Sequence, residues 1–161
     1  MAELFGRERV LELMTDILSA LQEYERETDN MVNAEIEVLQ EALIARNELI
    51  DTLEDLKAEL QSVVECESPE EQALLKTLIN GSFVKGELDD LHKKIQLAQR
   101  NITVTKQRIV DKDKVISEQF KERRTDSRRE LEQLKATKQK IGYYNSAVVG
   151  RATGQSLNKN L

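Results

Sequence analysis

The sequence predicts an all-α protein: an antiparallel bundle of long, coiled-coil-like helices with a flexible C-terminal tail. Of its 161 residues, 34% are charged and only 4% aromatic, with a single Pro, which suits solvent-flanked helices better than a β-sandwich or barrel. Apolar residues also recur at spacings of three, four and seven along most of the chain, as in amphipathic helices. We expect one helical bundle over residues 1–141 and a tail over residues 142–161.

The first two helices are expected over residues 3–27 and 33–64. The first has an apolar face broad enough for two neighbours, formed by Leu4, Val10, Leu11, Met14, Ile17, Leu18, Leu21 and Tyr24. The second lacks Gly and Pro and carries three rows: Ile36, Leu43 and Ile50; Leu39 and Leu53; Leu49, Leu56 and Val63. Asn33 is a candidate N-cap for the second helix, and a helix continuous through Asn33 is the alternative.

A third helix is expected over residues 69–80, beginning at Ser68-Pro69-Glu70-Glu71. The Ser68 hydroxyl can accept from the N–H of Glu71, while the Glu71 carboxylate can reach back to the N–H of Ser68. Pro69 has the backbone angle of a first helical residue and lacks an N–H that would have no partner there. Because the preceding linker is short, this helix should run antiparallel to the second.

The next helix is expected over residues 86–122. Its apolar row repeats every seven residues, as in coiled coils: Leu88, Ile95, Ile102, Ile109 and Ile116, with Leu74 fourteen residues before. Gly81 and Gly86 predict a kink or break before it, or alternatively a functional hinge. Ser127 and Glu130 repeat the capping-box spacing, so a last helix is expected over residues 127–141, with Leu131, Leu134 and Ile141 on its apolar face.

Charge is distributed unevenly along the chain, whose formal net charge is −6. Residues 1–80 hold 6 basic and 20 acidic residues, whereas residues 81–161 hold 18 basic and 10 acidic ones. We expect the two halves to fold back and pair their charges; a basic face for nucleic acid or an acidic partner is the alternative. The densest basic cluster is interpreted as a solvated helix face rather than a nucleic-acid contact: Arg123, Arg124, Arg128 and Arg129.

The sequence offers no chemistry typical of an enzyme, and we expect neither catalysis, a cofactor, a metal site nor a small-molecule substrate. The single histidine, His92, is flanked by Leu91 and Lys93-Lys94 and is expected to be exposed on a helix. The single cysteine, Cys66, excludes an internal disulfide and is expected to be a passive thiol. No signal peptide is recognisable, and no apolar stretch approaches the ~20 residues of a membrane span. These features predict a soluble, cytoplasmic protein.

The chain changes character at Gly142, after which small polar residues dominate. Such a segment cannot bury a core of its own, and we expect it to be disordered in isolation. It nevertheless carries Tyr143, Tyr144, Val148 and Val149, which would suit folding on a partner surface. An inert tail is the alternative.

The stretch from Glu35 to Leu56 resembles the second helix of flagellar type III export chaperones, the FlgN and FliT families. The positions that carry the resemblance are Leu39, Leu43, Arg46, Glu48, Leu49 and Ile50. The ending is also similar, with Tyr143-Tyr144-Asn145 after the last helix and a small polar tail.

The resemblance implies a cytoplasmic helical chaperone. It would hold hook–filament junction (hook-associated) proteins or the filament cap protein before export, and deliver them to a component of the export gate. The family's contacts lie in its C-terminal region, which implies contacts at Tyr143 and Tyr144, and less directly at Ile141, Val148 and Val149. With Leu134, from the apolar face of the last expected helix, these residues make up the predicted partner-binding site. Which cargo is bound, and whether the protein is a monomer or a homo-oligomer, stays open.

Two other functions remain alternatives to a chaperone. A structural or assembly coiled coil without cargo would form a rod-like homo-oligomer and would not need its tail. A nucleic-acid-associated helical protein would use the cluster from Arg123 to Arg129, and its binding would fall steeply with ionic strength.

Overall fold

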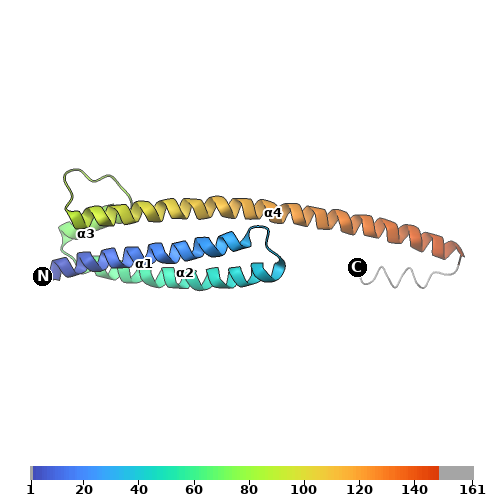
Figure 1. The fold of residues 1–161 in the computed structure, drawn as a ribbon, viewed down its shortest axis with the longest axis horizontal. Helices are drawn as coiled ribbons and strands as arrows, with labels where there is room; N and C mark the ends of the chain where they lie inside the picture. The colour runs from blue at the N-terminus through green and yellow to red at the C-terminus, as the bar shows by residue number, and fades with distance from the viewer. Residues whose placement is uncertain (1, 149–161) are drawn as a thin grey trace. The chain divides into compact units, whose positions relative to one another are not determined.

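The computed structural model describes the backbone of residues 2–148 and the side chains of residues 6–138. Over this range it contains the helices α1 (Ala2–Met31), α2 (Ile36–Glu65), α3 (Pro69–Ile79) and α4 (Asp90–Val148), which confirms the all-α class (Figure 1). The chain divides into two compact units, Met1–Ile116 and Ser117–Leu161. The first contains α1, α2, α3 and the beginning of α4; the second contains the rest of α4.

In the first unit the helices pack antiparallel as expected, with α2 returning along α1 and α3 reversing direction after α2 (Figure 1). The beginning of α4 runs in the same direction as α1. Arg7 of α1 pairs with Asp89 just before α4, and Glu25, five turns further along α1, pairs with Arg108.

Two clusters of buried apolar side chains form the core of this unit. The larger joins α1, α2, α3 and α4 and has Leu13, Leu75 and Ile95 completely buried. The smaller lies around Met31, Leu39 and Ile116. Of the predicted seven-residue row, Ile95, Ile102, Ile109 and Ile116 are buried on α4 as expected, whereas Leu88 is only partly buried and lies before α4, which begins at Asp90 rather than residue 86. By contrast, the predicted row Ile36, Leu43 and Ile50 of α2 is exposed.

The chain reverses between α2 and α3 as the sequence predicts. Ser68 caps α3 by accepting a hydrogen bond from the N–H of Glu71, at 3.3 Å, and Pro69 is the first residue of the helix. The Glu71 side chain differs from the capping-box prediction, because it is buried against α1 and α4. Gln72 stabilises the turn instead, donating from Nε2 to the carbonyls of Glu65 and Glu67.

The helical structure is interrupted around Gly81 and Gly86, where the sequence predicted a break. α3 ends at Ile79, and Gly81 follows with φ +73°, a left-handed conformation that ends helices and that glycine adopts without steric cost. Asn33 plays a similar part after α1, with φ 54°. The prediction that Asn33 caps α2 is therefore wrong: Glu35 is the residue at that position, and its side chain makes no capping hydrogen bond.

α4 is longer than the sequence indicates. The helices expected over residues 86–122 and 127–141 are one helix, and Ser127 lies inside it rather than at a new N-terminus. No Gly or Pro interrupts residues 90–141, so nothing in the backbone forces an end there. Residues 142–148, expected in the tail, continue α4, and residues 149–161 lie outside the described residues.

Candidate functional site

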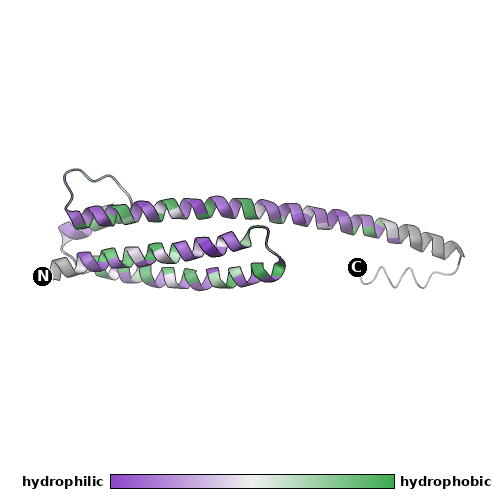
Figure 2. Ribbon diagram, in the orientation of Figure 1, coloured by the Kyte–Doolittle hydropathy of each residue, from purple (hydrophilic) through white to green (hydrophobic). Residues whose placement is uncertain are grey.

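The second unit is a largely hydrophilic helix that carries a few apolar residues (Figure 2). Between Ser117 and Lys138 no side chain is buried. Phe120, Leu131 and Leu134 are exposed by 37%, 44% and 51%. Their spacings of 11 and 3 residues put the three on one face of α4, since three helical turns span about 11 residues. We call these three residues the α4 stripe.

The structure describes the predicted partner-binding residues to different extents. Leu134 belongs to the α4 stripe and is half exposed. Ile141, Tyr143, Tyr144 and Val148 lie on α4, but their side chains are outside the described part. Val149 lies outside the described residues altogether.

The stripe is bordered by basic side chains. Arg124, Arg128 and Lys135 are exposed on one side of it, whereas Arg129, nine residues after Phe120, lies on the opposite face of α4. Asp126 and Glu130 are exposed on its other side, so the surroundings of the stripe are mixed in sign rather than uniformly cationic. A mixed surface is typical of a helix that pairs with another helix, where the flanking charges select the partner.

The positions behind the family resemblance are divided between core and surface. Leu39 is buried, whereas Leu43 and Ile50 are exposed by 43% and 38%. Arg46 joins three helices. It donates to both carboxylate oxygens of Asp113 on α4, at 2.9 and 3.1 Å, and its guanidinium lies 4.3 Å from the ring centroid of Tyr24 on α1. This geometry assigns Arg46 to holding the helices together.

Sequence reasoning missed a buried polar cluster at the other end of the first unit. His92 is only 5% exposed, so its predicted exposure is wrong. Its Nε2 lies 2.6 Å from Glu71 Oε1 on α3, and its Nδ1 lies 2.8 Å from Asp89 Oδ1. Arg7 of α1 completes this polar cluster, with Nε 3.0 Å from the same Glu71 oxygen. A buried carboxylate between an arginine of α1 and a histidine of α4 fixes three helices relative to one another.

Asp89 also serves as the N-cap of α4. Its Oδ1 accepts from the backbone N–H of His92 at 2.8 Å. This backbone hydrogen bond, aided by the charges of His92 and Arg7, holds the pKa of Asp89 below its ordinary value. The sequence Asp89-Asp90-Leu91-His92 carried this signal, because an Asp preceding a helix is a preferred cap.

Within residues 2–148, none of the helices is long and apolar enough to cross a membrane. Over the same described residues, no three His, Cys, Asp or Glu side chains are grouped so as to hold a metal ion. Comparisons of the chain with protein-family models, with curated proteins and with solved structures find no match.

Proposed function

We propose that the protein is an export chaperone of the flagellar type III class. In this role it holds an amphipathic helix of a late flagellar structural protein, a hook–filament junction protein or the filament cap, until the export gate receives it. The resemblance of residues 35–56 and of the chain's ending to the FlgN and FliT families supports this assignment.

The observation that carries the proposal is the α4 stripe. Burying exposed apolar surface on a partner is favourable by roughly 25 cal/mol per Å². Three large apolar side chains on one face of a charged helix therefore provide a surface that a second amphipathic helix would cover. The interleaved acidic and basic side chains would then select the partner's orientation.

The test measures binding of the purified junction and cap proteins by isothermal titration calorimetry. Leu134→Glu places a charge on the stripe and should weaken cargo binding at least tenfold, about 1.4 kcal/mol. Ala136→Glu is the matched control: it adds the same charge to an exposed position on a different face of α4, and should change affinity less than twofold. Circular dichroism should show unchanged helicity for both variants.

Two results would contradict the proposal. The first is the absence of binding to any junction or cap protein by the wild-type chain. The second is an equal loss of affinity in the stripe variant and the control variant. That result would mean that cargo binding responds to added negative charge anywhere on α4 and not to the stripe. A pull-down with the full chain and with a chain ending at Ile141 extends the test: recovery of the protein alone with both baits would favour a structural coiled coil.

A further inference from the structure

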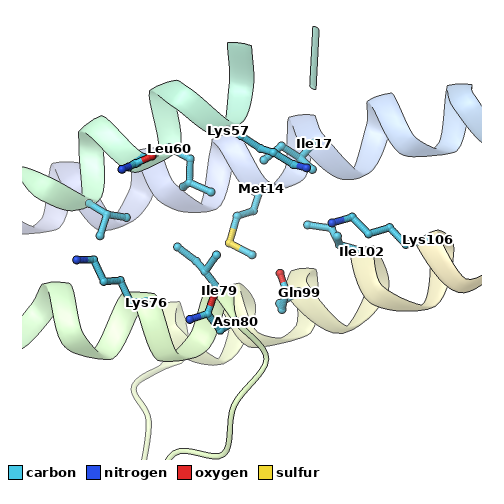
Figure 3. A pocket seen from close by; sticks show the side chains of 12 residues that line it. Met14, Ile17, Lys57, Leu60, Lys76, Ile79, Asn80, Gln99, Ile102 and Lys106 are labelled. Carbon is cyan, nitrogen blue, oxygen red and sulfur yellow. The ribbon is translucent and has the colours of Figure 1, made fainter. Parts of the chain in front are cut away.

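A groove opens between the four helices of the first unit and shares no residue with the α4 stripe (Figure 3). It has a volume of about 440 Å³, within the range of ordinary ligand sites. Its apolar lining comes from every helix: Met14, Ile17, Leu60, Val64, Ile79 and Ile102. The Met14 side chain points into the groove from α1, across from Ile79 of α3 (Figure 3).

Lysines are the charged residues that line this groove. They are Lys57 of α2, Lys76 of α3 and Lys106 of α4, and no acidic side chain lines it with them. The amines of Lys57 and Lys106 lie at one end of the view and Lys76 at the other (Figure 3). The groove is therefore apolar in the middle and cationic at both ends.

Two of these lysines, Lys57 and Lys76, are unusual because they lie in the acidic half of the chain. Residues 1–80 contain only six basic residues against 20 acidic ones. The four arginines among them all form ion pairs: Arg7, Arg9, Arg26 and Arg46. The two lysines, Lys57 and Lys76, both line the groove, and in the part of the chain that the structure describes neither has a carboxylate within ion-pair distance.

Lys106 lies in the same groove, in an environment that disfavours its positive charge. Burial lowers the pKa of its amine, and the nearby charge of Lys57 lowers it further. Two ammonium groups that approach each other beside an apolar surface are stabilised by an anion placed between them. Residues 1–80 are strongly acidic, yet among the described residues Lys57 and Lys76 form no ion pair. This arrangement indicates that the negative charge facing these lysines comes from another molecule.

We propose that this groove binds an acidic linear segment of a partner polypeptide. Apolar side chains of the segment would cover Met14 and Ile79, and its carboxylates would pair with Lys57 and Lys106 at one end and with Lys76 at the other. A polypeptide fits better than a fatty acid, because a monocarboxylate supplies charge at one end only. The chain's own residues 149–161 contain no Asp or Glu and do not complement the groove.

The test selects binders from a displayed library of random 15-residue segments against the wild-type protein. Selected segments should be enriched in Asp and Glu around a pair of large apolar residues. Their affinity should fall at least tenfold for the triple variant Lys57→Gln, Lys76→Gln, Lys106→Gln. A control removes the same charge from exposed positions of α4 outside the groove and should change affinity less than twofold: Lys93→Gln, Lys94→Gln, Lys114→Gln.

A charge-reversed variant makes the test bidirectional. With glutamate in place of all three groove lysines, the same library should yield basic instead of acidic segments. The proposal is overturned if wild-type selection shows no excess of acids, or if the selected segments bind the glutamine variant equally well. Should the triple variant lose helicity, the single change Lys57→Gln provides the same comparison, because it removes one of two repelling charges.

Two further outcomes separate this inference from others. If a second copy of the chain fills the groove, sedimentation will show a dimer that the glutamine variant abolishes, and the partner assignment is then wrong. The acidic segments should bind the variant Leu131→Glu, Leu134→Glu as well as wild type. The proposal for the groove can therefore be refuted while the proposal for the α4 stripe holds, and the reverse is also possible.

Discussion

Replacing Glu71 with leucine tests whether the buried polar cluster holds the first unit together. Glu71 is 7% exposed and has Arg7 and His92 within 3.0 Å of one carboxylate oxygen. Removing one partner of a buried ion pair costs about 3–5 kcal/mol, because the remaining charge stays buried without a counter-charge. Arg7 keeps a quarter of its side chain in water and remains 3.4 Å from Asp89, which relieves part of that cost. We therefore expect a loss of about 3 kcal/mol in the free energy of unfolding.

The double variant sharpens this prediction. Replacing His92 alone by leucine should cost about 2 kcal/mol, because Arg7 still compensates Glu71. Replacing both Glu71 and His92 by leucine exchanges a polar pair for an apolar one of comparable size, but it still leaves Arg7 without the Glu71 carboxylate, so the double variant should lose about 3 kcal/mol, no more than Glu71→Leu alone. The loss in the double variant should thus be smaller than the sum of the single losses by about 2 kcal/mol.

Urea unfolding followed by circular dichroism at 222 nm measures these differences. With a slope of about 2 kcal/mol per molar urea, a loss of 3 kcal/mol moves the midpoint down by roughly 1.5 M. Single losses below about 0.5 kcal/mol, or losses that simply add in the double variant, would refute the view that these side chains act as one buried unit.

Two other contacts give predictions of the same kind. Arg46→Lys should lower the free energy of unfolding by about 1–2 kcal/mol in urea titrations, because lysine cannot donate to both oxygens of Asp113 while lying on the Tyr24 ring; a loss no larger than that of an exposed Arg→Lys change would contradict this. Asp89→Asn should keep the cap but lose the charge. Because the folded pKa of Asp89 lies below its unfolded value, the charged carboxylate stabilises the fold above about pH 4, and this contribution disappears as the pH falls through the lower folded pKa. The difference in thermal midpoint between the wild type and Asp89→Asn should therefore be present at pH 7 and shrink near pH 3, and a difference that grows on acidification would show the sign to be wrong.

Local signals in the sequence predicted most of the fold. Ser68 and Pro69 located the start of α3, and Gly81 located the break after it, because caps and left-handed turns depend on a few neighbouring residues. The seven-residue isoleucine row of α4 predicted its buried face correctly. Periodicity did not distinguish buried from exposed apolar rows on α2, where Ile36 is 71% exposed. That distinction depends on which neighbours the helix acquires.

The long-range polar contacts could not be predicted in the same way. The basic neighbours Lys93 and Lys94 suggested a solvated His92, yet one residue of a helix can face inward while the next two face outward. Its partner Glu71 is 21 residues away and on another helix. Nor did spacing reveal that Lys57, Lys76 and Lys106 share one groove, because each belongs to a different helix. For the α4 stripe, the sequence identified Leu131 and Leu134, but the expected end near residue 122 separated Phe120 from them.

The repeated isoleucines of α4 have a consequence for helix register. Ile95, Ile102, Ile109 and Ile116 are identical and seven residues apart, so sliding α4 by seven residues would put an isoleucine back into three of these four core positions. Apolar packing alone therefore discriminates weakly between the native pairing and a slipped one.

Polar contacts remove this ambiguity. After such a slip, Arg46 would face Lys106 or Phe120 in place of Asp113, and Glu25 would face Asn101 or Val115 in place of Arg108. Each slipped pairing would leave a charge uncompensated or opposed to a like charge, at a cost that the repeated core cannot recover. The ion pairs that join α1 and α2 to α4 thus select one alignment among several that the core would accept.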